Sequence, residues 1–158
     1  MKNRIKSVAA FVVGLVCGIV FMIYRCGYIL ESCKKRTDKF ISYFNLLDRW
    51  MTCKEQEYPF ADFFYENNIK SVAIYGMGKI GKHLKYELEK AGIAISYVID
   101  EGENVIYGKE RHYNLRDSLP ITDIVVVTPV YEYEEIKKRI LNNNSKLKVV
   151  SIEAVIGK

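Results

Sequence analysis

The chain has 158 residues, the length of one ordinary domain with some sequence to spare. Hydrophobic residues make up 49% and charged residues 27%, a balance typical of a folded protein and not of a disordered one. The net charge is +5, but residues 1–56 hold 10 Lys or Arg against 4 Asp or Glu, whereas residues 57–158 hold 14 against 15. Because the longer C-terminal part is not basic, we exclude nucleic acid as a partner.

An apolar segment near the N-terminus predicts a membrane anchor. Ser7 to Tyr24 carry no charged side chain, and Lys6 and Arg25 bracket the segment. As a helix rising about 1.5 Å per residue it would be roughly 27 Å long, close to the ~30 Å hydrocarbon core of a bilayer. A cleaved secretory signal would need a shorter apolar core and an A-x-A-like cleavage site, which the following sequence does not supply. We therefore expect residues 1–30 to form an uncleaved, single-pass anchor.

Basic residues flank this segment on both sides, so the charge pattern gives its orientation only a small bias. More of them follow the segment than precede it, which favours a cytoplasmic C-terminal part by the positive-inside rule. Those in the sequence CKKRTDK would either attract anionic lipid headgroups or simply mark the topology. We expect a membrane protein whose globular domain lies in the cytoplasm.

The cysteines all lie within the first 53 residues, so none can form a disulfide inside a later domain. They are Cys17, Cys26, Cys33 and Cys53. No C-x2-C spacing occurs, and neither His83 nor His112 has a Cys, Asp or Glu at the spacing of metal ligands. We interpret the cysteines as packing or membrane residues, place both histidines on the surface, and predict no metal site.

Residues 31–67 predict an amphipathic helical lead-in. Apolar side chains recur at helical spacing at Phe40, Phe44, Leu47 and Met51, with Ile41, Tyr43 and Trp50 beside them. A second, short helix starts at Pro59 and turns Phe60, Phe63 and Phe64 inward. Both helices either pack on the globular domain or provide a surface for self-association. Two heptads are too few to predict a coiled coil.

Strands alternate with helices over residues 68–158, which form the predicted globular domain. Strands are expected at 71–76, 93–100, 105–107, 123–129 and 146–152, and helices at 79–92, 114–119 and 131–144. In the first of these helices Ile80, Leu84 and Leu88 face inward, and Gly92 ends it. Such alternation is typical of an α/β fold in which helices cover both faces of a parallel sheet of about five strands.

A glycine pattern occupies the turn between the first strand and the first helix. Gly76, Met77, Gly78, Lys79, Ile80 and Gly81 form G-x-G-x-x-G, in the one context where the pattern has a mechanism. Its first glycine permits the tight turn, its second lets a pyrophosphate approach the backbone, and its third lets the helix lie close to the sheet. Asp100 ends the second strand 24 residues after Gly76, near where a ribose-binding carboxylate belongs. Together these features predict a small Rossmann-like domain.

Each residue of this pattern also has a structural interpretation. The glycines could serve only the turn and the helix packing in a fold that has lost its ligand, and Asp100 could simply begin the turn DEGEN. Lys79 places a cation near the expected phosphates but is as well explained by solvation. Both interpretations stay open at this point.

Catalytic side chains are hard to find in the sequence. Tyr133 and Lys137 form a Y-x-x-x-K pair like that of short-chain dehydrogenases, but they open the helix after the strand at 123–129, which is the wrong place. No G-x-S-x-G, P-loop or H-E-x-x-H motif occurs. We therefore assign no catalytic residue and leave enzymatic activity undecided, leaning against it.

The stretches SVAIYGMGKIGKHL, ISYVID and LPITDIVVVTPVYEYEEI resemble Rossmann-type domains of bacterial cell-surface polysaccharide proteins. Similar domains include the nucleotide-sugar-binding N-terminal domain of sugar O-acyltransferases and the membrane-tethered domain preceding some nucleotide-sugar dehydratases. The resemblance spans about residues 68–157 and implies NAD(P) or a nucleotide-sugar over the glycines. It further implies roles for Asp100 at the ribose and for Thr128 and Pro129 at the neighbouring strand end. Neither an acyltransferase repeat nor a dehydratase domain follows here, so that catalysis is not carried over.

The expected function is therefore that of a membrane-anchored module that binds a nucleotide or nucleotide-sugar as an accessory to surface-polysaccharide biosynthesis. Its expected partners are this small molecule, the membrane, and either a second copy or a polysaccharide-assembly protein. Two other functions stay open. One is an NAD(P)-dependent oxidoreductase or epimerase-like enzyme completed by a partner, and the other is a ligand-free scaffold.

Overall fold

The structure is a computed structural model that describes residues 2–56, 60–102 and 110–156. The chain divides into two compact units, residues 1–41 and residues 42–158. Each unit is described by itself. One helix, α1 (Lys2–Glu55), contributes residues to both of them.

The unit of residues 1–41 is helical throughout its described part. From Phe11 to Tyr24 its large apolar side chains are exposed. Helix α1 is long and apolar enough to cross a membrane, by length and composition. Beyond this stretch the polar residues begin, and Glu31 and Lys35 form an exposed ion pair one turn apart.

The unit of residues 42–158 contains a five-stranded sheet in which every pairing is parallel. Its strands are β1 (Ser71–Tyr75), β2 (Ala94–Ile99), β3 (His112–Tyr113), β4 (Ile124–Val127) and β5 (Val149–Ser151). They lie side by side in the order β3-β2-β1-β4-β5. The chain therefore adds β2 and then β3 on one side of β1, and afterwards β4 and then β5 on its other side.

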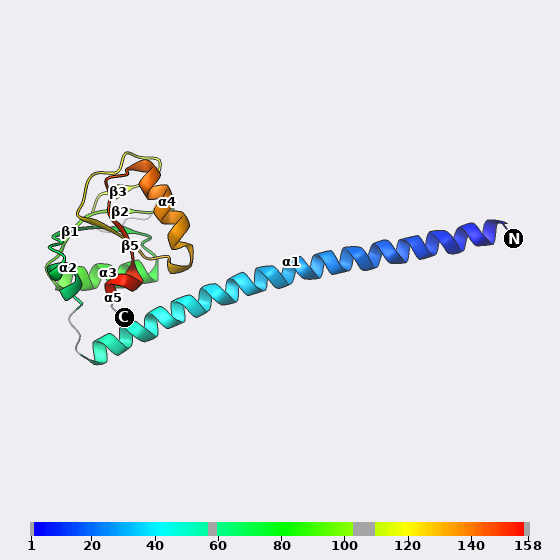
Figure 1. Cartoon of the computed structure of the whole chain (residues 1–158), viewed down its shortest axis with the longest axis horizontal. Coiled ribbons are helices and arrows are strands. Elements are labelled where there is room, and N and C mark those ends of the chain that lie inside the picture. Colours follow the sequence, from blue (N-terminus) through cyan, green and yellow to red (C-terminus); the bar gives the residue numbers. More distant parts are fainter. Residues whose placement is uncertain (1, 57–59, 103–109, 157–158) are drawn as a thin grey trace. The chain divides into compact units, whose positions relative to one another are not determined.

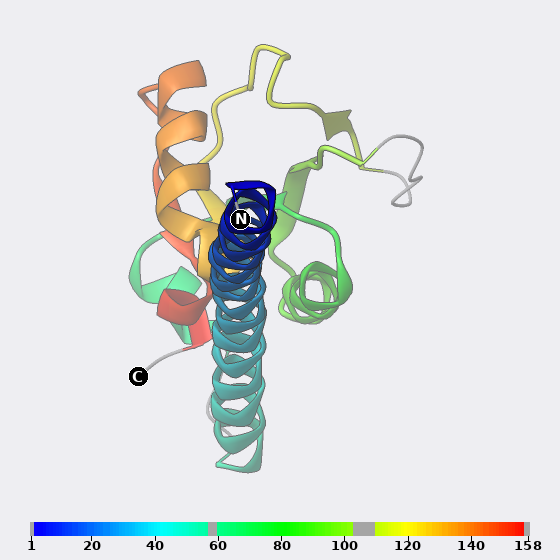
Figure 2. The ribbon, with the colours of Figure 1, turned by 90° about the vertical axis from the view of Figure 1, so that its right-hand side faces the viewer.

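Helices cover both faces of this sheet, as Figure 1 and Figure 2 show. One face packs against α2 (Asp62–Glu66), α3 (Lys79–Lys90), α5 (Ile152–Ile156) and the last turns of α1. The other face packs against α4 (Tyr133–Asn143), which follows the short 3-10 helix η1 (Val130–Glu132). Successive strand residues alternate between the two cores: Val72 and Ile74 of β1 lie in one, Ala73 and Tyr75 in the other. Burial on both faces explains why β1 and β4 read as continuous apolar runs.

The end of α1 belongs to the core of this unit. Leu46 and Trp50 are buried on the face of the sheet that α3 covers. Arg49 forms an ion pair with Glu153 of α5, with 2.7 Å between Nη2 and Oε1. The predicted apolar positions Phe44, Leu47 and Met51 are instead exposed. The domain thus buries the face of α1 that carries Leu46 and Trp50, and not the predicted apolar face.

Most predicted elements are present, and three differ. The expected helix at 114–119 is a turn, because the Asn114 and Asp117 side chains accept hydrogen bonds from the N–H groups of Arg116 and Asn114 and compete with a helix. Strand β3 and helix α5 were not predicted. The strand expected at 105–107 and the helix start at Pro59 lie outside the described residues.

Candidate functional site

The glycine turn connects β1 to α3 at the carboxyl end of the central strand. Gly76 has a φ of +85°, a left-handed conformation that favours glycine. A Cβ atom at this position would lie 2.9 Å from Thr128 Oγ1 and 3.1 Å from Pro129 Cδ. Gly76 thus allows both the tight turn and the close approach of the end of β4.

Gly78 precedes the first residue of α3 and leaves the space above it open. It has φ −62° and ψ −161°, and no side chain caps the helix. Among the described residues, no heavy atom outside its own chain neighbours lies within 4 Å of where a Cβ would be. The helix therefore presents uncapped N–H groups and the positive end of its dipole toward this space. Lys79, its first residue, is exposed, whereas Ile80 is buried in the core.

The third glycine holds the helix against the turn. A Cβ at Gly81 would lie 2.1 Å from the carbonyl oxygen of Gly76, a distance that real atoms do not adopt. Helix α3 can therefore pack this closely only because residue 81 has no side chain. Of the three glycines, the first and the third are required by the local packing, while the second is not.

Asp100 follows β2 and lies beside the glycine turn, as its place in the sequence predicted. Its Oδ2 accepts a hydrogen bond from the backbone N–H of Met77 at 2.8 Å, and its Oδ1 accepts one from Gly102 at 3.0 Å. The Met77 side chain is buried. The Asp100 carboxylate is thereby fixed at the carboxyl end of β2, where it stabilises the glycine turn.

Thr128 follows β4, and its hydroxyl also holds the turn. The side chain is only 4% exposed, and Oγ1 donates to the carbonyl oxygen of Gly76 at 2.7 Å. Its distance to the carbonyl oxygen of Tyr75 is 3.1 Å. Through these contacts the Thr128 hydroxyl positions the glycine turn.

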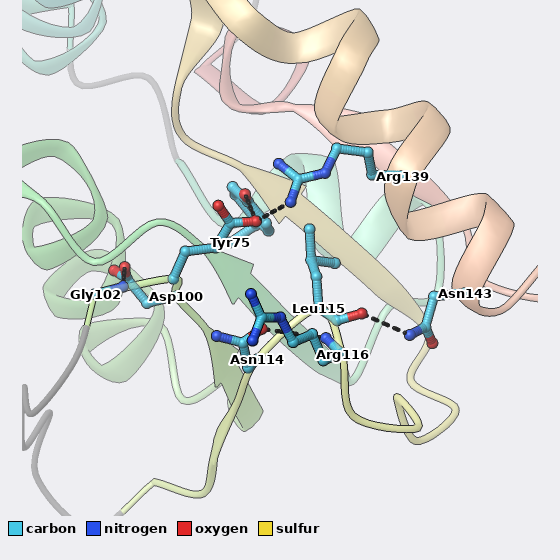
Figure 3. A network of polar contacts seen from close by, with 9 residues as sticks. Tyr75, Asp100, Gly102, Asn114, Leu115, Arg116, Arg139 and Asn143 are labelled. Atoms are coloured by element: carbon cyan, nitrogen blue, oxygen red, sulfur yellow. Dashed lines mark hydrogen bonds and ion pairs between the residues drawn. The ribbon is translucent and has the colours of Figure 1, made fainter.

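A hollow of about 230 Å³ opens at the carboxyl ends of β1 and β4. Its lining comes from the residues that end or follow β1, β2 and β4, from η1 and from α4, and includes Tyr75, Gly76, Asp100, Glu101, Pro129, Glu132, Glu135 and Arg139. Figure 3 shows Tyr75, Asp100 and Arg139 around it. Three residues of this lining, Gly76, Asp100 and Pro129, were predicted from the sequence as site residues.

An ion pair forms part of the lining of this hollow. Arg139 of α4 donates a hydrogen bond to the Glu101 carboxylate, which follows β2. This hydrogen bond raises the pKa of the Arg139 guanidinium. Both side chains stay partly exposed, at 44% and 45%, so the pair is accessible from solvent. Within the hollow lining, Arg139 is the cation among the carboxylates of Asp100, Glu101, Glu132 and Glu135.

Tyr75 places a protonated phenol beside this pair. Its hydroxyl lies 3.5 Å from Glu101 Oε1. Burial first, and then the charge of Glu101, raises the pKa of Tyr75 to about 12. At neutral pH the phenol therefore remains a hydrogen-bond donor.

A second hollow of about 380 Å³ lies on the other side of the same ion pair. It is lined by Glu101, Asn114, Leu115, Arg116, Arg139 and Asn142. Asn143 of α4 fixes the loop at residues 115–117, because its amide donates to the carbonyl oxygen of Leu115 at 3.0 Å (Figure 3). The same amide donates to the carbonyl oxygen of Asp117 at 2.8 Å. The Glu101–Arg139 pair thus separates two adjoining hollows at one edge of the sheet.

Tyr75, Glu101 and Arg139 were not predicted as site residues. Glu101 and Arg139 are 38 positions apart in the sequence, so no local motif joins them. The available signal was positional: Tyr75 ends the first strand, Glu101 follows the second, and Arg139 lies two turns into the helix after β4. A search of the polar residues at the carboxyl ends of the strands would have included Tyr75 and Glu101 but not Arg139.

The other chemical candidates lie away from this hollow. The Tyr133 hydroxyl donates to the carbonyl oxygen of Val149 at 3.2 Å, and the Lys137 amine lies 5.5 Å from the centre of the Tyr133 ring. Neither residue lines the hollow. His83 is exposed and meets Trp50 edge-on, and His112 is exposed on β3. In the described part of the chain, no three His, Cys, Asp or Glu side chains are grouped to hold a metal.

Comparison of the chain with protein-family models, with curated proteins and with solved structures gives no match.

Proposed function

We propose that the chain is a membrane-anchored, Rossmann-like module that binds a nucleotide or nucleotide-sugar at the carboxyl edge of its sheet. The order of the strands supports this proposal, since it equals the first five strands of the doubly wound dinucleotide-binding fold. In open α/β sheets, ligands bind where the crossovers from two neighbouring strands run in opposite directions. Here those strands are β1 and β4, and the turn beginning at Gly76 lies between their ends.

The observation that carries the proposal is the difference between the three glycines. Gly76 and Gly81 fill structural requirements, but nothing in the described packing requires Gly78 to lack a side chain. An uncapped helix start with open space above a glycine suits a phosphate group, which needs close approach to backbone N–H groups. A turn retained only for packing would need its first and third glycines alone.

The charges around the turn suit the two ends of such a ligand. Phosphate would lie at the start of α3, where the helix dipole and Lys79 are positive. Hydroxyl groups of ribose or of a sugar would lie in the hollow, where carboxylates such as Asp100 and Glu135 accept hydrogen bonds. Arg139 and the Tyr75 phenol add donors in the same place. This division of charge supports a nucleotide or nucleotide-sugar over a ligand with phosphates at both ends.

The cellular setting of the proposal rests on the sequence resemblance. A single-pass anchor with the domain in the cytoplasm would keep the module beside enzymes that use nucleotide-sugars at the membrane. The long apolar part of α1 supports the anchor. We propose that the module acts by binding and assists surface-polysaccharide assembly.

Titration of the full chain in lipid nanodiscs with NAD(H), NADP(H) and UDP-, GDP- and CMP-sugars tests this function. We expect saturable heat with one class of ligand. The decisive variant is Gly78→Asp, because aspartate is a favoured N-cap and should stabilise α3 by a few tenths of a kcal/mol relative to glycine. Its carboxylate would occupy the N–H groups and repel phosphate, so binding should be lost while the domain stays folded.

Gly78→Asn is the matched control for charge, since asparagine caps equally well without a negative charge. Binding should fall less in this variant than in Gly78→Asp.

A preference of the wild-type chain for NAD(P) would favour redox chemistry, and a preference for nucleotide-sugars would favour sugar assembly. Absence of binding by the wild-type chain across the whole panel would contradict the proposal and leave the scaffold interpretation.

A further inference from the structure

Helix α1 has a second apolar face that the described domain leaves largely exposed. In the unit of residues 42–158, Leu46 and Trp50 of this helix are buried, but Phe44, Leu47 and Met51 are 70%, 41% and 64% exposed. Phe40, in the other unit, is 70% exposed. Large apolar side chains at such spacing on a soluble surface indicate an interface.

The spacing of these residues is that of a coiled-coil seam. Steps of four, three and four residues separate Phe40, Phe44, Leu47 and Met51, so they occupy d, a, d and a positions of a heptad. Counted back along the sequence, the same register assigns further a and d positions to Cys26, Leu30, Cys33 and Thr37. We call these residues, from Cys26 to Met51, the seam.

Charged residues are frequent in this part of α1 but avoid the seam completely. Between positions 25 and 51 they are Arg25, Glu31, Lys34, Lys35, Arg36, Asp38, Lys39, Asp48 and Arg49. None of them falls on an a or d position, and the first charge to do so is Lys54, which pairs with Glu87 of α3. A solvated helix would have no reason to keep one stripe free of charge over this length.

Apolar surface also continues beside the seam in the unit of residues 42–158. A hollow of about 300 Å³ lies between α1 and α3, and Leu47 and Met51 line it together with Trp50 and His83. A second helix laid along the seam would cover this hollow. The apolar surface is thus wider than a single row of side chains.

We propose that α1 pairs in parallel with α1 of a second copy of this chain along the seam. The parallel direction rests on the proposed membrane anchor, because two copies inserted in one bilayer with the same topology must run the same way. A second copy is the occupant that the register favours, since an a/d seam is complementary to itself. Two identical nucleotide sites would then be held at one place on the membrane.

Native cysteines allow a direct test. Equivalent d residues of a parallel pair face each other across the axis, within the Cα separation of about 4.4–6.8 Å that a disulfide requires. Cys33 is exposed and carries a free thiol. Copper-phenanthroline oxidation of the full chain in membranes should therefore cross-link a variant with Cys17→Ser, Cys26→Ser and Cys53→Ser through Cys33.

Lys35 supplies the matched control. It is exposed and lies two residues from Cys33 on the heptad f position, which points away from a partner. With all native cysteines replaced by serine, Lys35→Cys should cross-link at least about tenfold less, because its thiols cannot reach disulfide distance. Equal cross-linking at the two positions would mean random collision and would overturn the proposal, as would none at Cys33.

A second pair of variants tests the apolar contact itself. Phe44→Glu places a charge on the seam, whereas Asn45→Glu places it one residue away on an exposed b position. Cross-linking through Cys33 should fall by roughly tenfold or more in Phe44→Glu, since each copy loses an aromatic ring that the paired helices would bury. It should be unchanged in Asn45→Glu.

Gly14 and Gly18 form a G-x-x-x-G pattern on another face of α1, a known dimerisation motif in membranes. Loss of the Cys33 cross-link in Gly14→Leu, together with its persistence in Phe44→Glu, would assign pairing to that face and overturn the seam.

None of these cross-linking measurements needs a nucleotide. A protein that cross-links without binding ligand would refute the proposed function alone, and recovery of the chain outside the membrane fraction would refute the anchor.

Discussion

Single hydroxyl and carboxyl groups hold the glycine turn in place, and Thr128 gives the sharpest case. Its buried hydroxyl donates to the carbonyl oxygen of Gly76 at 2.7 Å. Thr128→Val keeps the shape but leaves this buried carbonyl without its donor, which should lower the free energy of unfolding by about 1–3 kcal/mol. Urea unfolding of the full chain measures this loss.

Thr122→Val is the control for that prediction. The Thr122 side chain is also buried and donates to the carbonyl oxygen of Ser71 at 3.1 Å, but it lies at the other end of β4. A similar loss of stability is expected there. Only Thr128→Val should also weaken ligand binding, because only it releases the glycine turn. Equal effects on binding would contradict the role given to Thr128.

Asp123 makes the fold sensitive to acid at the start of β1. Its Oδ2 accepts from the backbone N–H groups of Lys70 and Ser71, both at 2.9 Å. These hydrogen bonds, that from Lys70 first, hold the pKa of Asp123 below its ordinary value of 3.8. A carboxylate whose pKa is lowered in the folded state stabilises the fold above its unfolded pKa, and this contribution is lost as the pH falls through the folded pKa.

Asp123→Asn tests this contribution because it keeps an acceptor oxygen but removes the charge. The variant should unfold at a lower urea concentration than the wild type at pH 7, and the difference should shrink as the pH falls below 3.8. Unfolding curves at several pH values provide the measurement. A difference of the same size at pH 7 and at pH 2.5 would mean that the charge of Asp123 does not act as described.

At the residue scale, the sequence predicted the roles of residues within the glycine turn but not the contacts between residues of distant elements. The roles of Gly76 and Gly81 follow from a local motif, and their close contacts bear these roles out. Arg139 and Glu101 meet only because the strand order brings α4 beside the end of β2. No spacing rule applies to such a pair, so this ion pair in the lining of the hollow could not be predicted.

At the level of elements, the packing of α3 on the turn depends on one glycine. Gly81→Ala would bring a methyl group to 2.1 Å from the Gly76 carbonyl oxygen, which is backbone and cannot turn away. Helix α3 must then shift, and we expect a loss of about 1–3 kcal/mol or more in the free energy of unfolding. Thermal unfolding followed by circular dichroism measures it.

Gly78→Ser is the matched control, because the open space above Gly78 accepts a side chain and serine is a favoured N-cap. Its stability should stay within about 0.5 kcal/mol of the wild type or rise. Should both serine at 78 and alanine at 81 be tolerated equally, the close packing of α3 on the turn would be refuted.

Among the elements, those with a strong local pattern were predicted and those set by tertiary contacts were not. Ile80, Leu84 and Leu88 recur at helical spacing, and all are buried in α3 as expected. Strand β3 has only two residues and no apolar alternation, so its pairing with β2 left no signal in the sequence. The turn at 114–119 followed from side-chain hydrogen bonds that outweighed a weak helical pattern.

For the whole molecule, α1 is the element that takes part in both the core and the proposed pairing of two copies. Its end carries apolar residues on two faces, and sequence spacing alone could not tell which of them the domain buries. Leu46 and Trp50 are buried in the core, whereas the seam is left exposed. A single helix thus completes the domain with one face and, as we propose, joins two copies with the other.

Neighbouring leucines separate these two functions in one experiment. Leu46 is fully buried, and Leu47 is 41% exposed on the seam. Leu46→Ala should lower the free energy of unfolding of the domain by about 2–5 kcal/mol, because it opens a cavity in the core. Leu47→Ala should change that stability by less than about 1 kcal/mol, since its side chain already meets solvent.

Cross-linking through Cys33 should respond in the opposite way, falling in Leu47→Ala and persisting in Leu46→Ala under conditions where the domain is folded. If Leu47→Ala instead unfolds the domain and leaves the cross-link intact, then the exposed face of α1 serves the fold and not the second copy.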